Sequence, residues 1–227
     1  MSSGMLDELH GLSEHHVGAV EGERAGVRLT PKTGAAFIKM REAALKDGLE
    51  LHVASGFRDF ARQNLIYTGK FDGVRQVLDR NEEPLDISQM SDEEKVRAIL
   101  YFSAIPGLSR HHYGTDIDVF AANLLIPGEE LDLTNRLYGT GNQRPLTKWL
   151  EKYMADFGFF RPYVHDGLTA GELWHISYAP EADVYTKMLT VAEAVSFVEA
   201  HNLRGVRALT DILKAEFNSR FKILSGW

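Results

Sequence analysis

The interpretation of this chain starts from one stretch, 109-SRHHYGTDIDVF-120. From Thr115 to Phe120 β-branched residues recur at alternate positions, which is typical of a strand. Gly114 precedes these residues and lets a loop turn into the strand. Asp116 and Asp118 are two positions apart, so their side chains would share one face. The stretch therefore predicts a strand with histidines and carboxylates gathered at its entrance.

Helices are indicated elsewhere by apolar residues at helical spacing and by capping signals. They are predicted over about 31–46, a short segment ending at Leu65, about 91–105, and 146–157. The tail, 181–227, is also predicted to be helical, with Thr190 and Glu193 capping one of its segments. Residues 68–89 show little periodicity, and we expect a long surface excursion there with at most one helical turn.

Two further strands are predicted, over 49–54 and 172–178. The three strands are short and separated by irregular stretches, unlike regular βαβ units. We therefore expect an α+β fold in a single domain, with a small, mainly antiparallel sheet flanked by helices. Its parts are an N-terminal segment over 1–29, a catalytic core over 30–180, and a helical C-terminal extension over 181–227 packed on the same domain.

Composition limits the possible functions. The 227 residues include no cysteine, which excludes disulfides, thiolate nucleophiles and zinc sites built on sulfur. The formal charge of −7 argues against a general affinity for nucleic acid. No transmembrane segment is predicted, because no stretch approaches the roughly 20 apolar residues that cross a bilayer. The sequence as it stands is expected to be cytoplasmic, or periplasmic or in the cell envelope if a leader has been removed.

Without cysteine, any zinc must be held by histidine, aspartate or glutamate. His111 on the loop and Asp118 on the strand are candidate ligands. His175, in the stretch ELWH, is a candidate third ligand, which would leave an open position for water. Glu172 in the same stretch would then serve as general base. On spacing alone, a solvated or hydrogen-bonded cluster explains these residues equally simply and is the more common case.

An ideal strand would send Glu172 and His175 to opposite faces. A joint role for them therefore requires a bend, which we expect near Gly171 because glycine permits one. Four other histidines lie in polar or helical surroundings and are expected at the surface: His10, His15, His16 and His201.

Three segments, in this order, resemble motifs of the zinc D,D-carboxypeptidases of the VanY type. SGFRDFARQ at 55–63 resembles S-G-[YF]-R-S-x-x-x-Q, SRHHYGTDID resembles S-x-H-x-x-G-x-A-x-D, and ELWH resembles E-x-W-H. The resemblance spans about residues 49–180. Agreement of three ordered motifs by chance is rare, although a motif is a hypothesis until its structural context is seen.

The resemblance implies a role for each matched residue. Zinc would be bound by His111, Asp118 and His175, with Glu172 as general base. Arg58 would hold the scissile carbonyl oxygen or a substrate carboxylate, a task that suits a rigid, permanently charged guanidinium. Two further residues are expected to touch substrate, Gln63 and Ser109.

The chain departs from the family motifs at two acidic residues. Asp116 stands where the family has alanine, and Asp59 where it has serine. We expect Asp116 to hydrogen-bond to a ligand rather than to bind the metal itself. His112 is a weaker candidate ligand than His111, since neighbouring residues of an extended chain point apart.

The resemblance implies hydrolysis of a peptide bond next to a D-amino acid in peptidoglycan stem peptides, most simply release of the terminal D-alanine. An L,D-carboxypeptidase, a D-Ala-D-Ala dipeptidase or a cell-wall endopeptidase would keep the same metal motif. A non-catalytic, zinc-stabilised peptidoglycan-binding module is an alternative from another class. Residues 68–92 and the helical tail after Pro180 lie outside the motifs and are expected to set specificity.

Overall fold

The computed structural model describes residues 3–128, 130–163, 168–223 and 225. Its central sheet is antiparallel and contains, in spatial order, β3 (Leu51–Ser55), β6 (Asp116–Ala121), β8 (His175–Tyr178) and β7 (Phe159–Phe160). Within this register Asp118 lies opposite Ser55 on one side and His175 on the other. The sheet thus brings together residues from the three distant sequence motifs, and the predicted α+β fold is confirmed.

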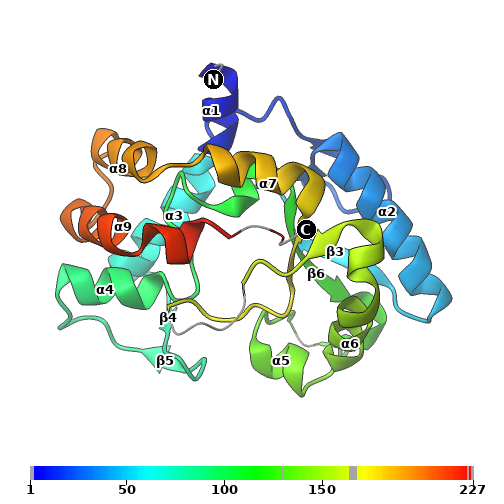
Figure 1. Cartoon of the computed structure of the whole chain (residues 1–227). Helices are drawn as coiled ribbons and strands as arrows, with labels where there is room; N and C mark the ends of the chain where they lie inside the picture. Colours follow the sequence, from blue (N-terminus) through cyan, green and yellow to red (C-terminus); the bar gives the residue numbers. More distant parts are fainter. Residues whose placement is uncertain (1–2, 129, 164–167, 224, 226–227) are drawn as a thin grey trace.

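One group of helices packs around the β3 and β6 side of the sheet (Figure 1). It consists of α2 (Pro31–Lys46), α5 (Asn135–Gly139) and α6 (Arg144–Tyr153). The start of α2 follows the predicted signals, because Thr30 accepts a hydrogen bond from the Thr33 amide and Pro31 occupies the first turn. Phe37 and Met40 of α2 are fully buried against the sheet residues Val53 and Val119.

A second group of helices forms another core on the opposite side of the molecule (Figure 1). It contains α3 (Phe60–Phe71), α4 (Asp92–Ile99), α8 (Val191–Ala200) and α9 (Val206–Phe221), and α1 (Ser3–Leu9) adds Leu9 to it. The capping box of Ser91 and Glu94 at the start of α4 is confirmed. The C-terminal helices thus share a core with α3 and α4.

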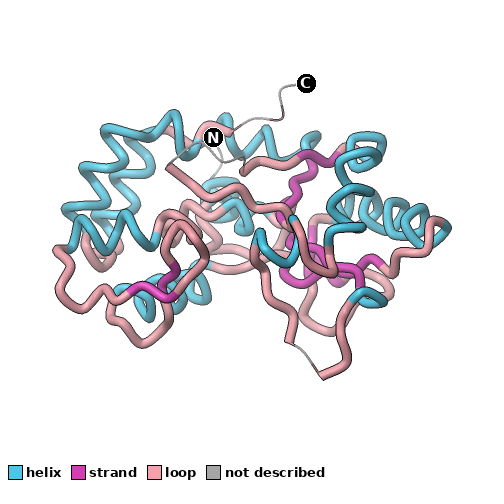
Figure 2. The backbone as a smooth tube through the Cα atoms, turned by 90° about the horizontal axis from the view of Figure 1, so that it is seen from below, coloured by secondary structure: helices cyan, strands magenta, loops and turns pink. Residues whose placement is uncertain are grey.

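Between the two groups runs α7 (Ala179–Met188), which follows β8 directly (Figure 1). The view from below separates the helices on the two sides and shows the strands between them (Figure 2). Two small hairpins complete the described elements: β1 (Gly18–Ala19) with β2 (Arg28–Leu29), and β4 (Val77–Leu78) with β5 (Pro84–Leu85). None of the helices among the described residues is long and apolar enough to cross a membrane.

Several predicted boundaries differ from the structure. The helix expected to end at Leu65 continues to Phe71, and the excursion after it forms the β4–β5 hairpin instead of a helical turn. Helix α4 ends at Ile99, before the predicted stop. The helix predicted over 146–157 changes after Tyr153 into the 3₁₀ turn η3 (Met154–Phe157), whereas residues 224, 226 and 227 of the predicted helical tail lie outside the described part of the chain. The division into parts at 29/30 and 180/181 stays a prediction.

Candidate metal centre and catalytic site

The side chains of His111, Asp118 and His175 converge at one end of the sheet. His111 comes from the 3₁₀ turn η1 (Arg110–Tyr113), Asp118 from β6, and His175 from the first position of β8. Gly114 makes the turn between η1 and β6 with φ of 69°. A Cβ atom at Gly114 would lie 2.4 Å from Cγ1 of Val17, so both the backbone conformation and the packing demand glycine.

The spacing of the three side chains suits a metal ion. Nε2 of His111 lies 3.4 Å from Oδ2 of Asp118, and Nδ1 of His175 lies 3.2 Å from Oδ1 of Asp118. One ligand atom from each residue lies within 4.8 Å of the other two. Ligand atoms around a tetrahedral zinc, at bonds of about 2.1 Å, are about 3.4 Å apart. The cluster therefore has the dimensions of a zinc site.

Hydrogen bonds behind the two imidazoles orient their free nitrogens toward Asp118. Nδ1 of His111 lies 2.9 Å from the carbonyl oxygen of Gly56, and Nε2 of His175 lies 3.0 Å from Oδ1 of Asp116. Because a carbonyl or carboxylate oxygen accepts, these two nitrogens carry the protons. The other nitrogen of each ring then presents a lone pair to the centre of the cluster, as a metal ligand does.

The donor set itself fits a cation. Oδ1 of Asp118 is one of the buried side-chain atoms without a hydrogen-bond partner among the described residues. A buried carboxylate oxygen without a partner carries a large desolvation cost. A cation held by Asp118, His111 and His175 would satisfy that oxygen, so the residues present fit a zinc ion.

Glu172 reaches the cluster through a turn. The chain from Glu172 to Trp174 is not part of the strand, and the His175 amide donates a 3.2 Å hydrogen bond to the Glu172 carbonyl. The bend predicted near Gly171 is thus centred on Leu173 and Trp174, and the strand starts three residues later than predicted. As a result Oε2 of Glu172 lies 3.3 Å from Nδ1 of His175.

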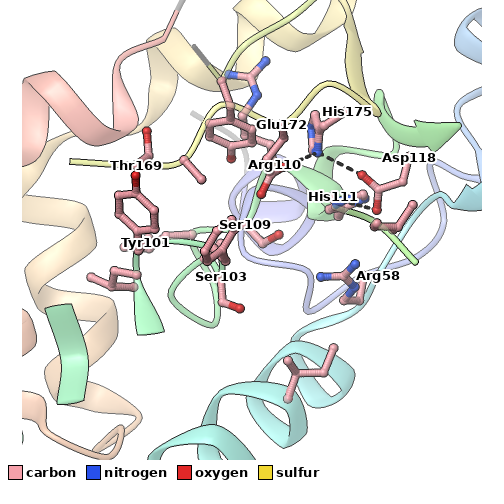
Figure 3. A pocket seen from close by; sticks show the side chains of 18 of the residues that line it. Arg58, Tyr101, Ser103, Ser109, Arg110, His111, Asp118, Thr169, Glu172 and His175 are labelled. Carbon is pink, nitrogen blue, oxygen red and sulfur yellow. Dashed lines mark ion pairs between the residues drawn. The ribbon is translucent and has the colours of Figure 1, made fainter. Parts of the chain in front are cut away.

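Arg58 is fixed beside the cluster. Its guanidinium donates to Oε1 of Gln63 at 2.7 Å and to Oγ of Ser55 at 3.1 Å. Figure 3 shows Arg58 close to His111 and Asp118. Burial lowers the pKa of Arg58, while the charge of Asp118 opposes that shift. None of the carboxylates among the described residues forms an ion pair with this half-buried cation.

Gln63 is buried beside Arg58. It is 1% exposed, and Nε2 of its amide donates to the carbonyl of Ala104 while Oε1 accepts from Arg58. Protein partners thus occupy both ends of the amide, and Gln63 does not line the cavity beside the cluster. Gln63 thus holds the guanidinium of Arg58, and its direct contact with substrate stays a prediction.

A cavity of about 310 Å³ opens from the cluster. Figure 3 shows it extending from His175 and Asp118 toward Tyr101 and Thr169. Ser109, 2% exposed, lines it, and its contact with substrate stays a prediction. The lining residues that were missed in the sequence include Lys70 and Tyr163. No local signal marked Lys70, because the helix that carries it was predicted to end at Leu65.

Asp116 is the hub of a buried network behind the cluster. Its carboxylate accepts from Nε of Arg110 at 2.7 Å and from the hydroxyls of Ser177 and Thr115 at 2.8 and 2.9 Å. Arg110 in turn donates to Ser177, to Thr186 and to the carbonyl of Ile223. Burial would raise the pKa of Asp116, but Arg110 and His175 outweigh it and hold the pKa well below its usual range.

The cluster can also balance its charges with a proton. Burial lowers the pKa of His175, yet the adjacent carboxylates of Asp116, Asp118 and Glu172 hold it well above the ordinary value. Burial would raise the pKa of Asp118, and His111 and His175 hold it well below the usual range. A proton on His175 and a metal cation therefore compete for the same place.

His112 is no ligand. It points away from the cluster, where the Gly107 amide donates to its Nε2 at 3.0 Å and its Nδ1 donates to the Arg58 carbonyl at 2.6 Å. Among the histidines expected at the surface, the prediction is wrong for His10, which is 3% exposed and stacks on Phe197. An apolar surrounding built from the C-terminal helices could not be seen in the local sequence.

Comparison with known proteins adds independent information. Residues 26–181 match the family described as VanY, D-alanyl-D-alanine carboxypeptidase. An uncharacterised protein of Haemophilus influenzae is 46% identical over 70 residues, which are 31% of this chain and 48% of the relative. A D-alanyl-D-alanine carboxypeptidase of Enterococcus faecalis is 27% identical over 161 residues, which are 69% of this chain and 49% of the relative. The matched part spans about half the length of each of these two relatives.

Solved structures share the fold. The vancomycin-resistance D,D-pentapeptidase VanY, solved as a point mutant in complex with Zn(II), has a TM-score of 0.51 and 22% identity, covering 77% of this chain and 85% of that one. VanYB with D-alanine-D-alanine has a TM-score of 0.51 and 23% identity, covering 81% and 90%. The LD-carboxypeptidase LdcB has a TM-score of 0.54 and 18% identity, covering 94% and 80%. At these identities the likeness concerns the fold.

Proposed function

Because the chain belongs to the VanY family of D-alanyl-D-alanine carboxypeptidases, we propose that it is a zinc peptidase that releases the terminal D-alanine from peptidoglycan stem peptides. The observation that carries the proposal is the convergence of Glu172 with His111, Asp118 and His175 at the mouth of one cavity. A structural metal site needs no carboxylate base beside it, whereas a hydrolytic site does.

His111, Asp118 and His175 would hold the zinc ion. The buried, unpartnered Oδ1 of Asp118 and the two imidazole lone pairs directed toward it support this set. When bound, zinc supplies a Lewis acid that polarises a carbonyl group and makes water a stronger nucleophile near neutral pH. Asp116 serves as the outer partner that fixes the ring of His175, as expected from its place on β6.

Glu172 would move the proton. Its Oε2 takes a proton from the attacking water and passes it to the amine of the leaving D-alanine. The turn at Leu173 and Trp174 places this carboxylate beside His175 and leaves it 15% exposed toward the cavity. A group that must both accept and release a proton needs such access to the reacting atoms.

Arg58 would bind the negative charge of the substrate. Its guanidinium is fixed by Gln63 and Ser55, is partly buried, and has no carboxylate partner among the described residues. A fixed guanidinium can hold the scissile carbonyl oxygen, on which charge develops, or the carboxylate of the terminal D-alanine. Ser109 lines the same cavity and is the second proposed substrate contact.

Several related activities would use the same residues. Release of D-alanine is supported by the family description and by the name of the Enterococcus faecalis relative. The structural neighbours include a D,D-pentapeptidase and an LD-carboxypeptidase, so removal of a residue from a tetrapeptide is the second candidate. An endopeptidase, a D-Ala-D-Ala dipeptidase and a peptidoglycan-binding module are the remaining alternatives.

Mass spectrometry of stem peptides incubated with the zinc-loaded protein tests the proposal. A pentapeptide ending in D-Ala-D-Ala, the corresponding tetrapeptide, free D-Ala-D-Ala and a cross-linked dimer are compared. Loss of one alanine from the pentapeptide supports the proposal. Exclusive cleavage of another substrate would assign one of the alternative peptidase activities, and binding without any cleavage would assign the binding module.

A further inference from the structure

The cavity carries a cation that the proposed chemistry does not use. Lys70 of α3 lines it together with Arg58 and Glu172. Its ammonium donates a 2.6 Å hydrogen bond to Oγ of Ser103, which Figure 3 shows at the cavity wall near Ser109. In the part of the chain that the structure describes, no carboxylate forms an ion pair with Lys70.

The surroundings of Lys70 favour an anionic ligand. Its side chain is half-buried, and burial lowers the pKa of the ammonium. Glu172 opposes this shift, whereas the cations Arg58 and Arg75 add to it. A partly desolvated ammonium with a single neutral partner gains more from an added carboxylate than an ammonium in water does.

Arg58 and Lys70 are held at different points along α3. Gln63, which holds Arg58, and Lys70 are seven residues apart, which is two helical turns or about 10 Å along the axis. Both side chains bond to neighbouring residues of the facing segment, because the Ala104 carbonyl accepts from Gln63 and the Ser103 hydroxyl accepts from Lys70. The cavity wall thus offers one cation, Arg58, beside the metal cluster and a second, Lys70, next to Ser103, which Figure 3 shows farther from Asp118 than Arg58.

We propose that Lys70 and Ser103 form a subsite for a second substrate carboxylate, on the acyl side of the scissile bond. This inference rests on the proposed carboxypeptidase function. The leaving D-alanine places its own carboxylate only one residue, about 3.5 Å, from the bond, within the range of Arg58. A carboxylate on the third residue before the bond lies about 9 Å away along an extended peptide, with further reach from the side chain that carries it. Lys70 is the cation placed for it.

Stem peptides provide a carboxylate of this kind. The free α-carboxylate of a γ-linked D-glutamate stands on the third residue before a D-Ala-D-Ala bond, and this is the group we assign to Lys70. A diamino acid with a side-chain carboxylate, one residue closer, presents the same chemistry. Specificity of the site then depends on whether these carboxylates are free or amidated.

Peptide binding to a zinc-loaded Glu172→Gln variant tests the subsite without turnover. Calorimetry gives Kd for two pentapeptides that differ only in a free or amidated glutamate α-carboxylate. A charged hydrogen bond predicts about ten- to a hundredfold tighter binding of the free acid. A second pair, with the diamino-acid carboxylate free or amidated, distinguishes the other source of the group.

Substitutions at Lys70 test whether this residue causes the preference for the free acid. In the same Glu172→Gln background, Lys70→Met is expected to raise the Kd of the acid peptide to that of the amide peptide, while the Kd of the amide peptide stays unchanged. Lys70→Arg is expected to keep most of the preference for the acid peptide. Ser103→Ala should reduce the preference severalfold, and this milder variant decides the matter if Lys70→Met does not fold. Lys39→Met, at an exposed lysine of α2, is the matched control and should change neither Kd.

The binding and turnover experiments test the Lys70 subsite and the proposed carboxypeptidase activity separately. Equal Kd values for the acid and amide peptides, or a Lys70→Met variant that weakens both equally, would overturn the subsite. Absence of turnover by the unmutated enzyme would instead contradict the proposed function, and the ratio of Kd values would still report on Lys70.

Discussion

The carboxylate of Asp116 lies 3.0 Å from Nε2 of His175, on the opposite edge of the imidazole from Asp118. It is fully buried and also accepts a hydrogen bond from Arg110. Asp116, which stands where the family motif has alanine, therefore hydrogen-bonds to the candidate metal ligand His175 on the side away from the metal cluster.

Asp116→Asn is expected to weaken zinc binding about ten- to a hundredfold, because outer hydrogen-bond partners fix the ligand ring and raise its basicity. It also leaves the buried charge of Arg110 without a counter-ion, which predicts a loss of unfolding free energy of about 3 to 5 kcal/mol. Chelator competition and urea unfolding measure the two effects. Asp59→Asn, at the other acidic departure, keeps the α3 cap and should change neither. Unaltered zinc affinity in Asp116→Asn would refute the outer role.

Glu172→Gln should keep its zinc and lose activity by about 10² to 10⁴, the usual contribution of a general base. Zinc content is measured by metal analysis and turnover by release of D-alanine. Glu199→Gln, at an exposed position of α8, is the control and should behave as the unmutated protein. Near-normal turnover of Glu172→Gln would remove this residue from the mechanism, and loss of zinc would make it a ligand.

Arg58→Lys is expected to restore little of the activity that Arg58→Ala loses. A single ammonium reproduces the charge, but it cannot reproduce the fork that Gln63 and Ser55 hold in place. Steady-state kinetics separate the roles, because a loss confined to KM indicates equal binding of ground and transition states, whereas an equal fall in kcat and kcat/KM indicates the transition state alone. Arg62→Lys, at an exposed position, is the control. If Arg58→Ala changed kcat and KM no more than this control does, Arg58 would be excluded from the site.

Because His112 is buried, we expect the unfolding free energy of the protein to fall in acid. Burial lowers its pKa from 6.5 in the unfolded chain to about 3, because desolvation disfavours the charged imidazolium. Between these values the unfolded chain binds more protons, so the stabilisation is complete above pH 6.5 and is lost as the pH falls toward 3. The unfolding free energy is therefore expected to change by about 1.4 kcal/mol per pH unit through this range because of His112 alone.

Urea unfolding of the metal-free protein at several pH values measures this slope. Comparison with His112→Gln subtracts the titration of the candidate ligands, which both proteins share. The slope of the unmutated protein should exceed that of His112→Gln by the amount given above. Parallel pH profiles would mean that His112 is not buried in its neutral form.

Local signals in the sequence predicted the parts of the site that depend on neighbouring residues. Gly114 marked the turn into β6, and alternation along 115–120 marked a strand with both aspartates on one face. The capping residues Thr30 and Ser91 marked two helix starts. Each of these features depends on contacts within a few residues, so the sequence carries its full pattern.

Contacts between distant segments could not be predicted in this way. The Arg110 guanidinium meets the Ile223 carbonyl across 113 positions, and its place in the fold depends on how the tail returns to the sheet. The bend before β8 was expected at glycine but occurs at Leu173 and Trp174, where packing of Trp174 in the core overrides local preference. Lys70 enters the cavity only because α3 runs two turns longer than predicted.

Anomalous diffraction on both sides of the zinc absorption edge, from crystals of the zinc-loaded protein, tests the central claim most directly. We expect a single strong peak at bonding distances of about 2.0 to 2.2 Å from Nε2 of His111, a carboxylate oxygen of Asp118 and Nδ1 of His175, with Glu172 outside the coordination sphere. A fully occupied peak bound by other residues, or an empty cluster in a protein that retains zinc, would contradict it.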